Sequence, residues 1–307
     1  MPPVESGLRI SVVIPAYRAW TTLPAVLAAL RPQIEGRNRE AIIVDSSGDG
    51  RAANLARATP WARVIALPER ALPGAARNVA YPEARGELIA FTDADAVPDQ
   101  HWLDELDRAL GADVDAVAGA ILNGTPRSAV GTAGYLLEFV DWLPSRRGRL
   151  LHAATCNLLI RRGALDVGGG FRTDLWPGED TILTFALGAT GRLAFAREAK
   201  VRHLNRTGMR AFVQHQRRLG RAFAEICASV DFPRTWFTRR WLTPIAPAIR
   251  LLSVGSRVRR DLRHTVAAVL VSPLLVLGAV AWVAGLAEGR RTVASRRASR
   301  AQVNEET

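Results

Sequence analysis

Cysteine is scarce in this chain, whose 307 residues include only Cys156 and Cys227. Two cysteines are too few for a disulfide framework and lack the spacing of a metal site, so we expect two free thiols. The N-terminus also lacks a basic segment followed by an apolar run, which is the pattern of a cleaved signal peptide. Both absences predict that the N-terminal part of the protein stays in the cytoplasm.

Acidic residues are scarce in the last third of the chain. Residues 1–200 contain 22 basic and 23 acidic residues, a net charge of −1, whereas residues 201–307 contain 19 basic and 6 acidic residues, a net charge of +13. Such a basic excess is typical of chains that bind nucleic acid or an anionic membrane. No helix-turn-helix, zinc or RNA-recognition pattern accompanies it, so we expect an anionic membrane and no nucleic acid as partner.

Short apolar runs alternate with amphipathic segments over the first 122 residues. The runs expected to form strands are 9–15, 40–44, 62–67, 87–92 and 116–122. The segments expected to form helices are 21–30, 52–58, 74–80 and 100–110. This alternation predicts an α/β fold with a mostly parallel sheet and helices on both faces. Ligands of such sheets bind at the carboxyl ends of the strands.

Asp93-Ala94-Asp95 lies at one of these carboxyl ends, directly after the predicted strand 87–92. Two carboxylates this close together can share a hard cation. Mg²⁺ and Mn²⁺ prefer oxygen ligands and often bind through one or two carboxylates plus the phosphates of a substrate. The alternative interpretation is an ordinary solvated turn that ends a strand.

Four further segments accompany this pair along the chain. They are Val12-Val13-Ile14-Pro15-Ala16-Tyr17, Ile43-Val44-Asp45-Ser46-Ser47-Gly48-Asp49-Gly50, Gly74-Ala75-Ala76-Arg77-Asn78, and Gly169-Gly170-Phe171 with Gly178-Glu179-Asp180. Together with Phe91-Thr92-Asp93-Ala94-Asp95 they resemble, over roughly residues 9–225, the family 2 glycosyltransferases. The resemblance implies the GT-A fold of nucleotide-diphospho-sugar transferases, a Rossmann-like α/β sandwich.

The resemblance also implies a donor site made from two strand ends and one helix. Pro15, Ala16 and Tyr17 would line the pocket for the nucleotide base, and Asp45 would accept a hydrogen bond from the base or the ribose. Arg77 would face the nucleotide or its phosphates, because a guanidinium suits bidentate phosphate contacts. The alternative for Arg77 is a salt bridge on the surface of a helix.

The same resemblance implies a metal ion and a catalytic base. Asp95 would be the direct ligand of Mg²⁺ or Mn²⁺, with Asp93 on the ribose or beside the metal, and His203 would approach the ion unless it is an ordinary core histidine. The cation would act as a Lewis acid on the departing nucleoside diphosphate. Asp180, next to Glu179, would be the general base of an inverting transfer. The alternative is that this acidic pair caps the N-terminus of a helix.

The sequence departs from the family pattern in three places. Arg18 stands where the family usually has Asn, and Ser46 stands where a second acidic residue is common, so recognition of the base is less well defined; a UDP-sugar is the favoured donor. The segment Gln214-His215-Gln216-Arg217-Arg218 has Arg in place of the Trp of the processive Gln-x-x-Arg-Trp signature. This difference favours a single transfer over chain polymerisation.

Residues 265–287 form an uncharged stretch of 23 residues, which is long enough to cross a bilayer core. Arginines flank it on both sides, Pro273 is tolerated in membrane helices, and Trp282 would fit the membrane interface. The alternative is a core helix, because Ala and Gly dilute its apolar character. Residues 235–256 mix aromatic side chains with arginines, which favours the headgroup region of an anionic membrane.

These features predict a catalytic GT-A domain over residues 1–228 and a membrane-associated helical tail. The tail would comprise a basic amphipathic juxtamembrane region (229–264), a candidate transmembrane helix (265–287) and a basic polar segment (288–307). The expected protein is a metal-dependent hexosyltransferase at the cytoplasmic side of the cell membrane. It would move one sugar from a nucleotide-sugar to a hydroxyl acceptor, a lipid or another cell-envelope intermediate. The alternative is a catalytically silent, nucleotide-sugar-binding membrane scaffold.

Overall fold

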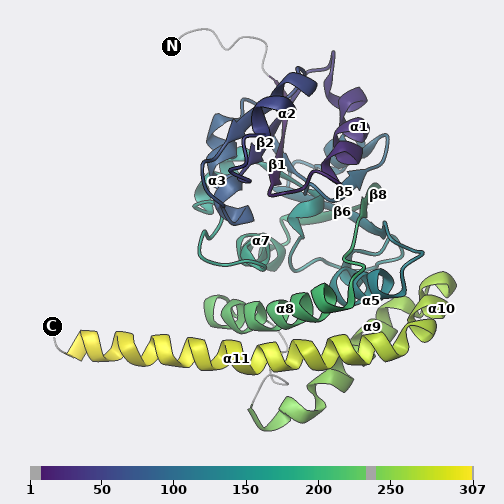
Figure 1. Ribbon diagram of the computed structural model, residues 1–307, viewed down its shortest axis with the longest axis vertical. Helices are drawn as coiled ribbons and strands as arrows, with labels where there is room; N and C mark the ends of the chain where they lie inside the picture. Colours follow the sequence, from purple (N-terminus) through teal and green to yellow (C-terminus); the bar gives the residue numbers. More distant parts are fainter. Residues whose placement is uncertain (1–7, 233–239, 306–307) are drawn as a thin grey trace. The chain divides into compact units, whose positions relative to one another are not determined.

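The computed structural model describes residues 8–232 and 240–305, which divide into two compact units (Figure 1). The first unit comprises Met1–Gly124 and Trp142–Leu204, and the second comprises Thr125–Asp141 and Asn205–Thr307. The predicted boundary at residue 228 does not coincide with this division. Helix α8 (Met209–Ser229), which runs through residue 228, belongs to the second unit because it packs against the C-terminal helices.

The first unit is an α/β sandwich, and this part of the prediction is confirmed. Its strands are β1 (Ile10–Ala16), β2 (Arg39–Asp45), β3 (Arg63–Ala66), β4 (Leu88–Phe91), β5 (Ala96–Pro98), β6 (Ala116–Asn123), β7 (Leu158–Arg161) and β8 (Leu193–His203). Its helices are α1 (Leu23–Ile34), α2 (Ala52–Ala58), α3 (Pro73–Glu83), α4 (Trp102–Ala109), α6 (Arg162–Val167) and α7 (Glu179–Thr190). The strands form one sheet in the order β3-β2-β1-β4-β7-β6-β8-β5.

The order of the parallel strands creates a switch point between β1 and β4. The chain moves outward from β1 to β2 and β3, and then returns to place β4 on the other side of β1. Because such crossovers are right-handed, α1 and α2 cover one face and α3 covers the other. The crevice at the carboxyl ends of β1 and β4 is therefore where a ligand of this fold binds.

The sheet is mixed, whereas the sequence predicted a mostly parallel one. β7 runs antiparallel to both β4 and β6, and the short strand β5 runs antiparallel to β8. β5 was not predicted, because it has three residues and contains Pro98, which removes a backbone donor. Pro98 is tolerated because β5 lies at the edge of the sheet.

Asn157 holds the sheet together where β6 and β8 change register between Gly119 and Ala120. Its Nδ2 donates to the carbonyl oxygens of Ala120 and Ala199, at 2.9 Å each. Its Oδ1 accepts a 2.7 Å hydrogen bond from the indole of Trp102. The Asn157 side chain thus satisfies backbone groups of two other strands. Asn157 itself lies in a short 3-10 turn, and β7 begins at the next residue.

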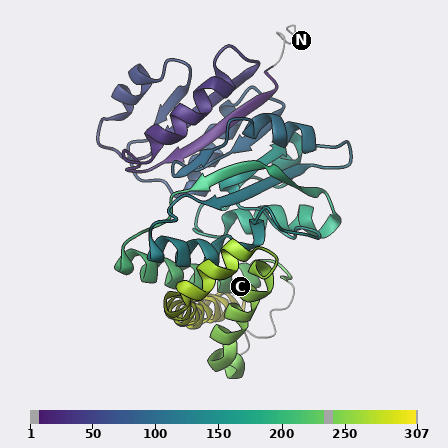
Figure 2. The same cartoon turned by 90° about the vertical axis from the view of Figure 1, so that its right-hand side faces the viewer.

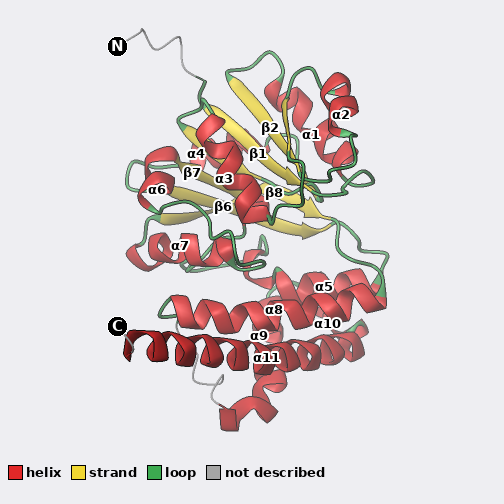
Figure 3. Ribbon diagram, turned by 60° about the vertical axis from the view of Figure 1, so that its left-hand side comes forward, coloured by secondary structure: helices red, strands yellow, loops and turns green. Residues whose placement is uncertain are grey.

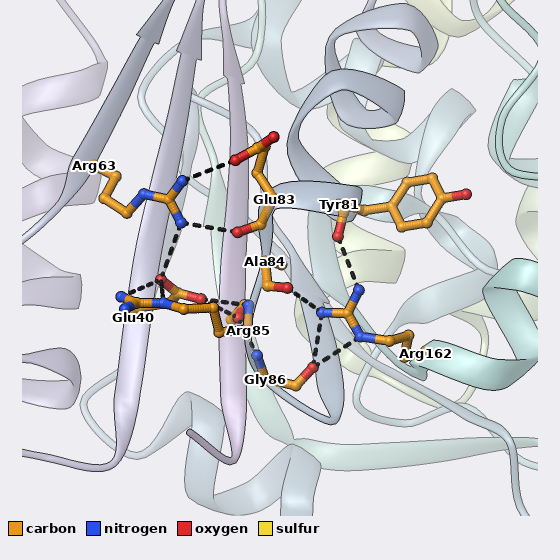
Figure 4. Close-up of polar contacts among 9 residues, drawn as sticks. Glu40, Arg63, Tyr81, Glu83, Ala84, Arg85, Gly86 and Arg162 are labelled. Atoms are coloured by element: carbon orange, nitrogen blue, oxygen red, sulfur yellow. Dashed lines mark hydrogen bonds and ion pairs between the residues drawn. The ribbon is translucent and has the colours of Figure 1, made fainter. Parts of the chain in front are cut away.

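Glu40 holds the sheet at the amino ends of its parallel strands, away from their carboxyl ends (Figure 4). Its buried carboxylate accepts hydrogen bonds of 2.7 Å from Ser11 Oγ and from the backbone N–H of Arg85, and the Arg85 guanidinium adds a 3.0 Å ion pair. Arg162 donates to the carbonyl oxygens of Tyr81, Ala84 and Gly86. Both residues therefore anchor the end of α3 to the sheet.

The second unit consists of helices in the part that the structure describes (Figures 2 and 3). They are α5 (Ala129–Glu138), α8 (Met209–Ser229), α9 (Ala246–Val258), α10 (Leu262–Leu270) and α11 (Ser272–Glu305), with a 3-10 helix at Arg240–Ile245. α8 and α11 run side by side, and α11 is seen nearly end-on in Figure 2. A core cluster of Ala224, Ala246, Trp282, Val283 and Leu286 joins α8, α9 and α11.

The predicted span 265–287 is divided between two helices. α10 ends at Leu270, and α11 starts at Ser272 with Pro273 in its first turn, where a missing N–H costs nothing. Proline inside a continuous helix would remove a hydrogen bond and clash with the preceding turn, so the chain breaks here. By length and composition alone, 272–296 of α11 could cross a membrane, but half of its apolar window is buried within the protein.

Trp282 does not occupy the predicted interfacial position, since its side chain is 4% exposed in the core of the second unit. The guanidinium of Arg250 lies 4.6 Å from the centre of its ring, and the ring of Phe223 lies 5.2 Å away. Residues 235–239 of the predicted interfacial segment 235–256 lie outside the described residues.

We expect Glu40→Gln to destabilise the first unit at neutral pH by about 1–3 kcal/mol, because a buried amide replaces a charge-assisted acceptor. Burial raises the pKa of Glu40, but hydrogen bonds from Arg85 and Ser11 outweigh it, and the net pKa is lowered. A lowered pKa gives stability above the unfolded value that is lost as pH falls. The free energies of unfolding of the wild type and of Glu40→Gln, measured with urea, should therefore become equal as the pH falls into the acid range. Glu87→Gln, at an exposed carboxylate, is the control, and a difference that persists in acid contradicts the argument.

Candidate functional site

The predicted donor-site residues meet at the carboxyl edge of the first unit's sheet. Ala16 and Asp45 are register partners at the ends of β1 and β2. β4 pairs with β1 on the other side and ends at Phe91, two residues before Asp93. The structure therefore brings these segments together at the switch point, as the strand-end rule predicted.

The Asp93-Ala94-Asp95 segment is a tightly held turn between β4 and β5. The N–H of Ala96 donates to the carbonyl of Asp93 at 3.1 Å, and the buried Thr92 hydroxyl donates to the carbonyl of Ala96 at 3.2 Å. The N–H of Leu204 donates to the carbonyl of Asp95 at 2.7 Å, which ties the turn to the end of β8. The backbone thus fixes where both carboxylates lie.

His203 and Asp95 form the part of the predicted metal site that the structure brings together. Nε2 of His203 lies 3.6 Å from Oδ1 of Asp95; the imidazole is buried, and the carboxylate is 35% exposed. Among the described residues, no group of three or more His, Cys, Asp or Glu side chains is arranged to hold a metal. An imidazole and a carboxylate at a solvent-accessible edge still fit Mg²⁺ or Mn²⁺, which take remaining ligands from substrate phosphates and water.

Arg77 has a different environment from the one predicted. Its side chain is 2% exposed; Nη1 donates to Oε1 of Glu179 and Nη2 donates to Oδ1 of Asp93, both at 2.7 Å. Both terminal nitrogens thus donate to carboxylates, and the burial of the guanidinium rules out the alternative of a salt bridge on the surface of a helix. The role toward the nucleotide or its phosphates stays a prediction. We call this Glu179–Arg77–Asp93 arrangement the arginine bridge.

Glu179 carries the strongest electrostatic perturbation at the site. Burial, and then repulsion from the adjacent Asp180, raise the pKa of Glu179 to about 7 against the opposing attraction of Arg77. Its Oε2 is buried and finds no hydrogen-bond partner among the described residues. Burial opposes the charge on Arg77 too, but Asp93, Glu179 and Asp180 outweigh it and raise the pKa of Arg77. The single positive charge of Arg77 does not balance the three carboxyl groups of Asp93, Glu179 and Asp180, and this favours a proton on Glu179.

Asp180 stands in the first turn of α7, as predicted, and is less buried than Glu179. Its Oδ1 accepts a 2.7 Å hydrogen bond from the N–H of Thr181, and its Oδ2 accepts one of 3.2 Å from the N–H of Thr155. Gly178, at φ 109°, makes the turn into the helix possible. The carboxylate is oriented by backbone donors on two segments, which suits both a positioned base and a helix-terminus contact.

Asp45 organises the loop that follows β2. Its side chain is buried, and Oδ1 accepts hydrogen bonds from the N–H of Ser47 at 3.0 Å and from the Ser47 hydroxyl at 2.5 Å. The same Ser47 oxygen accepts a 2.8 Å hydrogen bond from the N–H of Arg18, the one non-glycine residue with positive φ among those described. Asp45 therefore shapes the strand-end loops at β1 and β2.

Tyr17 is the exposed member of the predicted base pocket, next to the half-buried Pro15 and the buried Ala16. The guanidinium groups of Arg18 and Arg70 lie 5.4 and 4.7 Å from the centre of its ring. Arg70 was not predicted from the sequence, although it lies four residues after the end of β3 and the strand-end rule applies to it. An aromatic ring with two cations near it is suited to stacking a base and holding phosphates.

The Arg77-Asn78 pair and the Gly169-Gly170-Phe171 segment pack against each other. Asn78 Nδ2 donates to the Phe171 carbonyl at 2.7 Å, and its Oδ1 accepts from the Phe171 N–H at 2.9 Å. The Phe171 ring packs edge-on against Phe91 of β4 at 5.1 Å. A Cβ at Gly74 would overlap the Arg172 carbonyl, so only glycine permits this approach of α3. These motifs are thus contact partners.

Comparison with known proteins identifies the family of the chain. Residues 11–168 match the model of the family described as Glycosyl transferase family 2. Glycosyltransferase AglE of Haloferax volcanii is 26% identical over 181 residues, which make up 57% of this chain. The match spans 60% of that relative's length.

Two solved structures share the fold. Mannosyltransferase PcManGT from Pyrobaculum calidifontis, in complex with GDP-Man and Mn²⁺, has a TM-score of 0.62 at 18% identity and covers 92% of this chain and 86% of its own. Glucosyl-3-phosphoglycerate synthase from Mycobacterium tuberculosis, in complex with Mn²⁺, UDP-Glc and phosphoglyceric acid, has a TM-score of 0.50 at 20% identity. The match covers 73% of this chain and 81% of the synthase chain. At these identities the likeness establishes the GT-A fold.

The raised pKa of Glu179 gives a pH-dependent stability that Glu179→Gln should remove. A carboxyl whose folded pKa is raised stabilises the fold fully below its unfolded value, near 4.5, and this contribution is lost as pH rises through 7. Between about pH 5 and about pH 8, we expect the free energy of unfolding of the wild type to fall by on the order of 3 kcal/mol more than that of the variant. Urea unfolding measures this difference. Glu69→Gln, at an exposed position, should keep the wild-type slope. Equal slopes for wild type and Glu179→Gln would refute the protonated state.

Proposed function

Because the chain belongs to Glycosyl transferase family 2, we propose that it transfers one sugar from a nucleotide-sugar donor to a hydroxyl acceptor with inversion at the anomeric carbon. The observation that carries the proposal is the arginine bridge. It connects the Asp93-Ala94-Asp95 turn of the donor side to Glu179, the neighbour of the proposed base Asp180.

The donor is proposed to lie over the carboxyl ends of β1, β2 and β4. Pro15, Ala16 and Tyr17 line the base, and Asp45 receives a hydrogen bond from the base or ribose. The ring of Tyr17, with the guanidinium groups of Arg18 and Arg70 near it, supports this assignment, since it offers stacking and positive charge together. We favour a UDP-sugar; GDP-Man, bound by PcManGT, is the alternative donor type.

Asp95 and His203 are proposed to hold Mg²⁺ or Mn²⁺ together with the donor's phosphate oxygens, and Asp93 orients the turn through Arg77. When bound, this ion supplies Lewis-acid stabilisation of the negative charge on the departing diphosphate. Mn²⁺ is present in both solved structures described above.

Asp180 is proposed to accept the acceptor's hydroxyl proton as that oxygen bonds to the anomeric carbon and the bond to the diphosphate breaks. The proton then leaves Asp180 for solvent, which restores the carboxylate. Glu179 is unsuited to this role, because its carboxyl is buried and hydrogen-bonded to Arg77. It positions Asp180 instead, as the preceding residue of the same helical turn.

The acceptor is proposed to be a lipid or another cell-envelope intermediate at the cytoplasmic face of the cell membrane. The apolar, basic C-terminal helices support membrane attachment. The altered segment Gln214-His215-Gln216-Arg217-Arg218 supports a single transfer.

We expect Asp180→Asn to lower the rate of donor-sugar transfer at least about 100-fold while donor binding is kept, because general-base catalysis is lost and the fold is not. Nucleoside diphosphate release measures transfer, and thermal unfolding with and without donor measures binding. Asp113→Asn, at an exposed carboxylate after α4, should behave as wild type. Near wild-type turnover by Asp180→Asn would remove the residue from its role. Donor binding with no turnover in wild type would favour the scaffold alternative.

We expect Asp95→Asn to abolish the part of donor binding that depends on Mn²⁺. A panel of UDP- and GDP-sugars should raise the midpoint of thermal unfolding of the wild type most when Mn²⁺ is present, since ligands that bind the native state stabilise it. His203→Ala should reduce this increment, and donor without metal serves as the baseline. An unchanged Mn²⁺-dependent increment in Asp95→Asn contradicts the metal assignment.

A further inference from the structure

α10 carries an apolar face that the second unit leaves exposed. None of its residues is buried, and its large exposed side chains are Leu262 (78%), Val266 (49%), Val269 (67%) and Leu270 (76%). Their spacing of four, three and one residues places them on one side of the helix. Exposed apolar clusters of this kind mark an interaction surface.

α11 continues this pattern at its beginning. Val276, Leu277 and Val280 are 48%, 40% and 51% exposed, whereas Leu275, Ala279 and their successors along the opposite face are buried. The helix is therefore two-sided. One side packs on the helices of the second unit, and the other presents apolar side chains over its first three turns. We call the exposed set on α10, Leu262, Val266, Val269 and Leu270, the apolar face.

The buried side of α11 is joined to α8 by direct backbone approach. A Cβ at Gly220 of α8 would overlap the carbonyl oxygen of Trp282, and a Cβ at Gly285 of α11 would overlap that of Arg217. The Glu288 carboxylate pairs with the guanidinium groups of Arg217 and Arg221.

The partners of α11 are unsuited to a bilayer core. Arg217 and Arg221 lie on the polar side of α8 and are more than half exposed. Moving α11 across a bilayer would either separate it from these ion pairs or draw the charged residues of α8 into hydrocarbon, and both are costly. The contacts of α11 therefore favour a helix that stays with its unit.

Positive charge borders the apolar face. Arg259 and Arg260, in the link before α10, and Arg263, in its first turn, are all exposed. Basic side chains beside a strip of aliphatic residues match the anionic headgroups and acyl chains of a phospholipid surface. This charge complementarity favours a bilayer over a second copy of the chain, because two copies would bring like charges together.

We propose that the second unit docks on the surface of an anionic bilayer through the apolar face, and that α11 does not cross the membrane. The proposal rests on the membrane attachment in the proposed function and states its form. Leu262, Val266, Val269 and Leu270 enter the acyl boundary, and the arginines contact the headgroups. α8 remains on the aqueous side.

Vesicle binding by the purified full chain tests the apolar face. The wild type should cosediment with phosphatidylglycerol–phosphatidylcholine vesicles and bind pure phosphatidylcholine more weakly. The double variant Val269→Gln with Leu270→Gln should weaken this partitioning at least about tenfold, because two apolar side chains leave the lipid. Val167→Gln, at a 91% exposed valine of the first unit, should bind as wild type. Unchanged binding by the double variant overturns the proposal.

Cysteine labelling tests whether α11 crosses the membrane. In a background with Cys156→Ala and Cys227→Ala, single cysteines are placed at Ser256 in α9 and at Ser295 in α11, both exposed. An impermeant maleimide should label both from the same side of sealed membrane vesicles. Labelling from opposite sides would establish a span and overturn the proposal.

Two further readouts separate the alternatives. Sedimentation of the detergent-free protein should give the same mass for wild type and double variant; a dimer that becomes a monomer on substitution, with vesicle binding retained, identifies a second copy as occupant and overturns the proposal. Nucleoside diphosphate release with a soluble acceptor should be unchanged by Val269→Gln and Leu270→Gln. Absence of this release in the wild type would count against the proposed transferase function alone, since vesicle binding requires neither donor nor acceptor.

Discussion

The site depends on one buried cation. Arg77 has both terminal nitrogens at 2.7 Å from carboxylates, one on the turn after β4 and one at the start of α7. A buried arginine without these partners would leave a desolvated charge, and the carboxylates without it would repel each other. The position of the Asp93-Ala94-Asp95 turn and the position of the helix that carries Asp180 are therefore coupled. A displacement of either segment breaks an ion pair of the arginine bridge.

This coupling explains why motifs far apart in the sequence occur together. Gly74 permits the close approach of α3, Arg77 forms the bridge, and Asn78 pairs with the backbone of Phe171. Phe171 in turn packs on Phe91, at the end of the strand that leads to the Asp93-Ala94-Asp95 turn. Each motif supplies one half of a contact whose other half lies in another motif. A sequence pattern with several such halves in order is specific because the contacts are mutual.

The sequence predicted elements well where a local signal decides the structure, and less well where a tertiary contact does. Apolar runs identified β1, β2 and β4, and the strand-end rule located Asp45 and Asp93. The antiparallel direction of β7 and the existence of β5 follow from pairing across the sheet, which no local period records. Arg77 shows the same limit within the site. Its residue type suits phosphate and carboxylate equally, and only the fold reveals its contacts with the carboxylates of Asp93 and Glu179.

The apolar tail shows that length and hydropathy alone do not give the positions of helix ends and helix contacts. An uncharged run of 23 residues satisfies the requirement for a span, yet Pro273 places a helix boundary inside it and Gly285 commits the later part to α8. Proline acts because it lacks the N–H that a continuous helix needs, and glycine acts because it lets the backbone of α8 come close. Both change the structure without altering the hydropathy of the run. The exposed leucines and valines of α10 then lie on one side of that helix, beside exposed arginines. Aliphatic side chains bordered by basic residues are the pattern of a surface that enters one leaflet, and this pattern depends on where the helix ends rather than on the length of the run.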